Sequence, residues 1–104
     1  MRTRPQKLTW VEIMERLNTW EFFYSEHALS RIVKRGFFRI SIEDMLRGRT
    51  KRRFHFPRKD QFNEMIGHWK YCIRGKDMDG QDCKVIVTFE KNVVKIITVM
   101  NGEE

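Results

Sequence analysis

The chain has 104 residues, 40% of them hydrophobic and 34% charged, with a net charge of +7. This length predicts a single domain over residues 1–104, and the composition excludes a disordered chain. No apolar run approaches the roughly 20 residues that span a bilayer, and no apolar signal segment follows the basic start MRTRPQK, so we expect a cytoplasmic protein without membrane contact. The positive charge favours a polyanionic partner, above all nucleic acid, or an acidic protein, although such charge also simply keeps a protein soluble.

The first predicted element is a helix that follows a basic arm of residues 1–8. Thr9 and Glu12 form the T-x-x-E capping box, in which side chains and backbone amides of the first turn bond reciprocally. Apolar side chains then follow the spacing of one helical face: Trp10, Ile13, Met14 and Leu17. The pattern predicts a core helix over residues 9–19, followed by a short extended piece at residues 20–24.

A second helix is predicted between Ser25, which suits an N-cap, and Gly36, which suits the left-handed turn after a helix. Its apolar stripe would consist of Ala28, Leu29, Ile32 and Val33. A second stripe recurs every four residues beside it: His27, Arg31 and Arg35. One imidazole and two guanidiniums in a row suit the binding of a phosphate, but the same row is also typical of a solvated helix face.

A third, short helix is predicted from Ser41 and Asp44, which give a second capping signal, to Gly48, which closes the helical part at residues 9–48. The segment after it is basic and interleaved with aromatic residues: Arg47, Arg49, Lys51, Arg52, Arg53, Phe54, His55, Phe56, Arg58 and Lys59. Basic side chains attract phosphates and aromatic rings stack on unpaired bases, so the segment is a candidate RNA-binding surface. The alternative is a charged strand edge that prevents aggregation between sheets.

The sheet part is predicted over residues 49–101, ahead of a polar tail at 102–104, with a loop or brief helical turn after Pro57. Residues 68–74 alternate, which places Lys70, Cys72 and Arg74 on one face of a strand. Asp79-Gly80 and Lys91-Asn92 mark two hairpins around strands rich in β-branched residues. Helices followed by strands predict an α+β domain, in which two or three N-terminal helices pack on an antiparallel sheet of three or four strands.

The two cysteines, Cys72 and Cys83, match no zinc-binding spacing. We expect packed free thiols, and the sequence does not decide whether the two cysteines form a disulfide. The sequence contains no Gly-rich phosphate loop, no Ser-His-Asp order and no carboxylate pair at a spacing typical of metal sites or glycosidases, so we expect no cofactor and no metal.

The run SEHALSRIVKRG followed by ISIEDML resembles the domain of unknown function 4258, whose pattern is Ser-x-His-Ala-x-x-Arg-x-x-x-Arg-Gly, then Ile-Ser and a short helix. The ending DGQDCKVIVTFEKNVVKIITVM resembles that of the same family, so that the resemblance covers roughly residues 20–101. Two insertions depart from the pattern, FFR after Gly36 and PRKDQFNEMIGH before the second strand. The family is grouped with RelE- and BrnT-like ribonuclease toxins, so the resemblance implies a RelE/barnase-like small-RNase scaffold and a toxin that an acidic antitoxin neutralises.

Cleavage of RNA without a metal needs a base for the 2′-hydroxyl proton, cations for the charge on the phosphorane, and an acid for the leaving 5′-oxygen. His27 is the candidate base, because the positive end of the helix dipole favours a neutral imidazole there. Arg31 and Arg35 are candidate phosphate clamps. Polar positions in otherwise apolar strands complete the set: Arg74, Lys84 and Thr98.

Structural alternatives exist for each of these roles. His27 can orient its helix through a backbone carbonyl, Thr98 can simply favour β structure, and the two arginines can form salt bridges with Glu26, Glu43 or Asp44. Our first functional hypothesis is a metal-independent endoribonuclease toxin with the catalytic residues His27, Arg31, Arg35, Lys84 and Thr98. Its RNA-binding residues would be Arg47, Arg49, Lys51, Arg52, Arg53, His55 and Arg74. The second is a non-catalytic module of the same fold that binds nucleic acid or protein.

Overall fold

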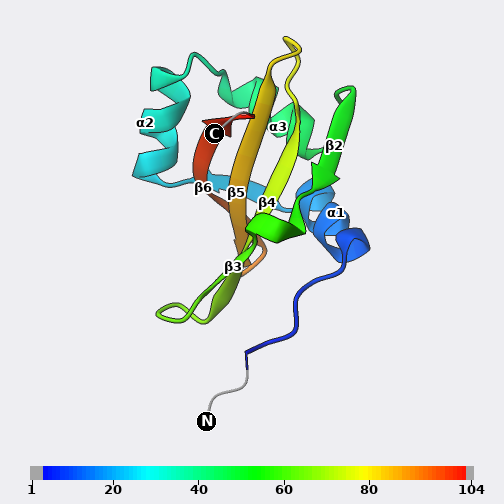
Figure 1. Ribbon diagram of the computed structural model, residues 1–104, viewed down its shortest axis with the longest axis vertical. Coiled ribbons are helices and arrows are strands. Elements are labelled where there is room, and N and C mark those ends of the chain that lie inside the picture. The colour runs from blue at the N-terminus through cyan, green and yellow to red at the C-terminus, as the bar shows by residue number, and fades with distance from the viewer. Residues whose placement is uncertain (1–3, 103–104) are drawn as a thin grey trace.

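In the computed structural model, which describes residues 4–102, helices and strands combine into the α+β architecture that the sequence predicts (Figure 1). The helices are α1 (Trp10–Thr19), α2 (Glu26–Lys34) and α3 (Arg39–Leu46). The strands are β1 (Glu21–Tyr24), β2 (Arg52–His55), β3 (Gln61–Asn63), β4 (His68–Lys76), β5 (Asp82–Glu90) and β6 (Val93–Asn101), and a 3₁₀ turn, η1 (Pro57–Lys59), precedes β3. The predictions for residues 1–3 and 103–104 lie outside the described residues.

The first two helices begin at the predicted caps. Thr9 Oγ1 accepts a hydrogen bond from Glu12 N (3.2 Å), and the Glu12 carboxylate accepts one from Thr9 N (2.9 Å), so both bonds of the capping box are present. Ser25 Oγ accepts from Ala28 N at the start of α2 (3.0 Å). After α2 the chain turns at Gly36, whose φ of 71° is a left-handed conformation that glycine adopts without strain.

The third helix begins earlier than its capping signal indicates. It starts at Arg39 after Phe38, which makes no side-chain cap bond, so the prediction of a cap at Ser41 is wrong. Ser41 is instead buried within α3, where its Oγ accepts a hydrogen bond from Met78 N (2.9 Å). Its hydroxyl therefore connects α3 to the β4–β5 hairpin rather than to its own first turn.

The sheet is larger than predicted and mixed in direction. Its strand order is β1-β6-β5-β4-β2, and β3 pairs with another part of β4. All pairs are antiparallel except β1, which runs parallel to β6 with Phe22 opposite Val94. The prediction of an antiparallel sheet of three or four strands is therefore only partly right. The extended piece predicted at residues 20–24 forms β1, whereas the segment that forms β3 carries too little alternation to be recognised as a strand.

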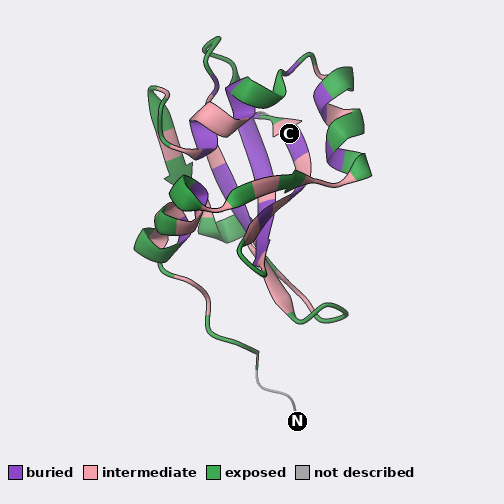
Figure 2. Ribbon diagram, turned by 180° about the vertical axis from the view of Figure 1, so that it is seen from behind, coloured by how far each residue is buried: buried purple, intermediate pink, exposed green. Residues whose placement is uncertain are grey.

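Helices α1 and α3 cover one face of the sheet, and α2 packs against β6, at the side of the sheet where β1 lies (Figures 1 and 2). The core between this layer and the sheet includes Ile13, Leu17, Ile42, Met45, Leu46, Ile73, Val85, Val87, Val94 and Ile96. At its edge position α2 buries only Ala28 and Ile32, whereas Leu29 is 39% and Val33 80% exposed. The four-residue apolar stripe predicted for α2 is thus only half buried. The opposite face of the sheet, which faces the viewer in Figure 1, has no α-helix of residues 4–102 over it.

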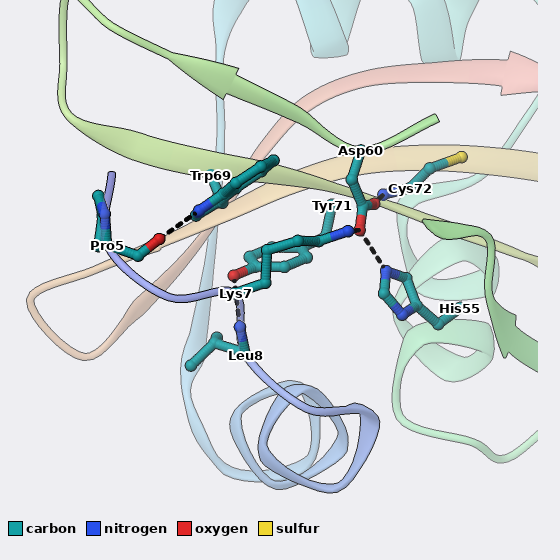
Figure 3. A network of polar contacts seen from close by, with 8 residues as sticks. All are labelled: Pro5, Lys7, Leu8, His55, Asp60, Trp69, Tyr71 and Cys72. Atoms are coloured by element: carbon teal, nitrogen blue, oxygen red, sulfur yellow. Dashed lines mark hydrogen bonds and ion pairs between the residues drawn. The ribbon is translucent and has the colours of Figure 1, made fainter. Parts of the chain in front are cut away.

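A buried carboxylate holds η1 and β3 against β4 (Figure 3). The Asp60 side chain is 1% exposed, accepts a hydrogen bond from Cys72 N (2.9 Å), and forms ion pairs with Lys7 Nζ (2.8 Å) and His55 Nε2 (2.6 Å). The His55 ring also stacks on Trp10, with 6.0 Å between ring centroids. Asp60 therefore joins the N-terminal arm, β2, η1 and β4 at one point.

The described part of the basic arm, residues 4–8, lies along β4 (Figure 3). The Trp69 indole donates a hydrogen bond to Pro5 O (2.7 Å), and Leu8 N donates one to the Tyr71 hydroxyl (2.9 Å). With the Lys7–Asp60 ion pair, these bonds fix the arm to the rest of the domain.

We predict that Asp60→Ala lowers the free energy of unfolding by about 3 kcal/mol, because it removes the acceptor of a buried amide and the partner of a buried ion pair. Urea denaturation at pH 7 measures the change. Asp79→Ala serves as the control, because Asp79 is exposed in the β4–β5 turn and its variant should stay within about 0.5 kcal/mol of the wild type. Equal losses in the two variants would contradict the role of Asp60.

Candidate nucleic-acid interface

The uncovered face of the sheet carries the alternate side chains of each strand. On β4, Tyr71 and Ile73 point into the core, so Lys70, Cys72 and Arg74 point to the uncovered face, as the alternation predicts. Residues directly opposite one another in paired strands share a face, which extends this assignment from β4 to its neighbours.

Two rows of side chains cross the uncovered face at right angles to the strands. The first row runs through four strands and consists of Phe54, Arg74, Lys84 and Met100. The second row, beside it, contains Cys72, Ile86 and Thr98. In the first row two cations, Arg74 and Lys84, lie directly opposite each other, an arrangement that destabilises a sheet unless an anion compensates it.

A β-bulge places Thr98 on this face. The register pairs Ile86 with Thr98 but Val87 with Ile96, so Ile97 is an extra residue in β6. Because Ile96 is fully buried in the core, regular alternation would also turn Thr98 towards the helices. The extra residue reverses the alternation and brings the Thr98 hydroxyl to the side of Lys84.

The second row, together with Lys84 and Met100 of the first, lines a groove of about 370 Å³, and Arg74 lies beside it, opposite Lys84. Its lining residues are Lys59, Gln61, Lys70, Cys72, Lys84, Ile86, Ile97, Thr98 and Met100. Three lysines, one amide and one hydroxyl therefore face a single concavity. Lys59 and Gln61 flank Asp60 in the sequence, so the buried carboxylate of Asp60 also holds one wall of the groove in place.

The cations at the groove lack counter-ions in the described part of the chain. Within residues 4–102 no carboxylate forms an ion pair with Lys59, Lys70, Lys84 or Arg74. Lys84 is only 5% exposed, and the Arg74 guanidinium carbon lies 5.8 Å from the centre of the Phe56 ring. Cations that lie close together without counter-ions repel one another, so this groove is electrostatically suited to an anion.

The basic stripe of α2 lies outside the groove lining. His27 is exposed in the first turn of α2, Arg31 is partly exposed, and Arg35 is the partly buried C-cap residue. The helix is attached next to the groove, because Ser25 Oγ donates a hydrogen bond to Ile97 O (2.9 Å), at the residue before Thr98. The structure thus brings Lys84 and Thr98 together and leaves the α2 stripe beside them.

Two arginines of the basic segment bond to the helical layer. Arg47 donates to Leu17 O (2.7 Å) and Trp20 O (3.2 Å). Arg53 donates to Leu46 O (2.7 Å), and burial lowers the pKa of its guanidinium. Both side chains therefore stabilise the helical layer on the covered side of the sheet.

The other predicted RNA-binding residues separate into two groups. Arg49 forms an ion pair with Asp44 (3.2 Å), and His55 pairs with Asp60. Lys51 and Arg52 are exposed, and Arg52 lies on the uncovered face because its cross-strand partner is Lys76. Arg74 belongs to the first row described above.

Of the polar residues that line the groove, Lys59 belongs to the basic segment that the sequence marks as a candidate RNA-binding surface, whereas Gln61 and Lys70 do not appear among the candidate site residues. Lys70 shares the alternation that singles out Arg74, so the sequence already contained the signal for it. Gln61 carried no such signal, because β3 was predicted as a loop or helical turn. Among residues 4–102, no three His, Cys, Asp or Glu side chains are grouped to hold a metal ion, and no helix is long and apolar enough to cross a membrane.

Both cysteines are free and buried, and they lie on opposite faces of the sheet, with Cys72 lining the groove and Cys83 in the core. Burial raises the pKa of the Cys72 thiol to about 11 and that of Cys83 to about 12. The neutral thiol is the weaker nucleophile, so both side chains are unreactive near neutral pH.

We expect iodoacetamide at pH 8 to alkylate the folded protein on the order of 100-fold more slowly than the urea-unfolded chain, because only about one thiol in a thousand is ionised at three pH units below its pKa. The rate for Cys72 should rise as the pH approaches 11. Mass spectrometry after quenching measures both rates, and equal rates in the folded and unfolded chains would contradict the raised pKa values.

The comparison with known proteins identifies a family. A family model described as a domain of unknown function (DUF4258) matches residues 24–101, which include α2, α3 and β2 to β6. No curated protein and no solved structure matches the chain. The matched residues make up most of the sequence, and the chain therefore belongs to the DUF4258 family.

Proposed function

We propose that this domain binds RNA on the uncovered face of its sheet and cleaves it without a metal ion. The observation that supports the proposal is the pair formed by Arg74 and Lys84, which lie opposite each other without a carboxylate partner in the described part of the chain. Cations that repel each other in the free protein gain stability when an anion binds between them.

The distribution of charge favours a chain of phosphates over one small anion. Lys70 and Arg74 lie four residues apart on β4, which separates their Cα atoms by about 13 Å. Lys84 and Lys59 add charge on the two sides of this strand. A polymer with regularly spaced phosphates can contact these positions in succession, and binding then releases several counterions.

In the proposed reaction, Lys84 and Arg74 stabilise the charge that gathers on the phosphorane, and the Thr98 hydroxyl donates to one of its oxygens. From the first turn of α2, His27 accepts the 2′-hydroxyl proton as the 2′-oxygen bonds to phosphorus, and Arg31 and Arg35 bind a neighbouring phosphate. The bond from phosphorus to the 5′-oxygen then breaks, the leaving 5′-oxygen takes a proton from solvent water, and the His27 imidazolium returns its proton to solvent. The attachment of α2 to β6 beside Thr98 supports this assignment.

The biological role that we propose is that of a toxin in a toxin–antitoxin pair. This role extends the resemblance to RelE- and BrnT-like toxins. The net charge of +7 supports an acidic antitoxin as the protein partner, because opposite charge accelerates association and strengthens the complex.

A second candidate, a non-catalytic RNA-binding module, is favoured by one observation. Among the described residues, the lining of the groove contains lysines, an amide and a hydroxyl but no imidazole and no carboxylate. Such a lining binds phosphates without supplying a group that readily exchanges a proton at neutral pH.

For RNA binding, we predict that Lys84→Met raises the Kd for a single-stranded RNA hexamer about tenfold and lowers the salt slope of log K by about 0.7, the value of one phosphate contact. Fluorescence anisotropy over a series of salt concentrations measures both quantities. The control is Lys91→Met, because Lys91 is an exposed lysine in the β5–β6 turn, and its variant should bind like the wild type. Unchanged binding by Lys84→Met would refute the proposed surface.

Cleavage is tested with the same RNA in EDTA. Loss of cleavage in His27→Ala, with the Kd unchanged, supports the ribonuclease. Intact RNA with excess wild-type protein, together with binding that depends on Lys84, would reject cleavage and leave the binding module.

A further inference from the structure

Aromatic side chains extend the first row of the uncovered face beyond the phosphate groove. Phe54 on β2 lies directly opposite Arg74 and is 37% exposed. The ring of Phe56 lies under the Arg74 guanidinium, at 5.8 Å. Two rings and one guanidinium are thus gathered beside Lys84, which follows Arg74 in the same row.

The side chains of β2 face the opposite way from those of most strands in a sheet with one covered face. Its charged or polar residues, Arg53 and His55, point to the helical side, while Phe54 points away from the core. A register shift by one residue would bury Phe54. The observed register is fixed because Arg53 bonds to Leu46 O and Asn18, and His55 pairs with Asp60.

The fold therefore holds an aromatic ring at the surface by means of internal polar contacts. Among residues 4–102, no α-helix lies over the face of the sheet to which Phe54 belongs (Figure 1), and its neighbour Arg74 has no ion-pair partner. Phe54 and Lys84 are two strand spacings apart, about 10 Å. This distance suits a ligand that carries a flat ring at one end and a phosphate at the other, as a nucleotide does.

We propose that Phe54, with Phe56 and Arg74, forms a stacking platform for an unpaired nucleobase whose backbone phosphates lie at Lys84. This inference rests on the proposed function and narrows its substrate to single-stranded RNA. Aromatic rings and guanidinium planes stack on exposed bases, whereas in a duplex the faces of the bases are covered by their neighbours. Stacking tolerates any base, so the platform confers strand selectivity rather than a sequence preference.

The test compares a ligand that has bases with one that has none. Phe54→Leu removes the ring and keeps the charge, so its Kd for hexaadenylate should rise on the order of tenfold while the salt slope stays unchanged. Its affinity for inorganic tripolyphosphate should equal that of the wild type. Lys84→Met should weaken the binding of both ligands, and Phe54→Trp should retain hexaadenylate binding.

The matched control is Phe38→Leu, because Phe38 is also an exposed phenylalanine but precedes α3, and its variant should bind like the wild type. Circular dichroism confirms that each variant is folded.

If Phe54→Leu binds hexaadenylate like the wild type while Lys84→Met does not, the platform is refuted and the phosphate surface stands. If wild-type protein binds neither ligand, the proposed function fails. If the wild type binds duplex RNA as tightly as single strands, the platform is also refuted.

Discussion

The RNA-binding proposal depends on two cations that face each other across neighbouring strands. Arg74 and Lys84 are cross-strand partners on the face of the sheet that no α-helix covers, and no carboxylate pairs with either in the described part of the chain. Such a pair of like charges does not stabilise the free protein. The arrangement becomes favourable when a phosphate joins it, which is why the RNA-binding proposal begins there.

On the covered side of the sheet, several cations have hydrogen-bond acceptors or a carboxylate partner. Asp60 pairs with Lys7 and His55, and Arg53 and Arg47 donate to backbone carbonyls of the helical layer. These cations on the covered side thus have acceptors, whereas among residues 4–102 the lysines of the groove have no carboxylate partner. The contrast separates structural cations from those available to a ligand. Asp60 also lies between Lys59 and Gln61 in the sequence. Its ion pairs with Lys7 and His55 therefore help to position two residues that line the groove.

Local signals in the sequence predicted the local structure well. The caps at Thr9 and Ser25 form as expected, and Lys91 and Asn92 adopt the positive φ values of 50° and 63° that suit a tight hairpin. Non-local features were less accessible: the parallel pairing of β1 with β6 depends on residues about 70 positions apart. The alternation of β4 predicted the face of Arg74, but the extra residue Ile97 alone decides the face of Thr98, and no sequence pattern marks it.

The location of the RNA on this protein can be measured directly by NMR. In a titration of ¹⁵N-labelled protein with a single-stranded RNA hexamer, we predict that amide shifts change mainly in β2, β4 and β5, around Thr98 at the β6 bulge, at Lys59 in η1, and in α2. Amides of α1 and α3, on the covered side, should change little. Changes confined to the helical layer, or no changes at RNA concentrations that saturate a micromolar site, would contradict the claim that the uncovered sheet face is the functional surface.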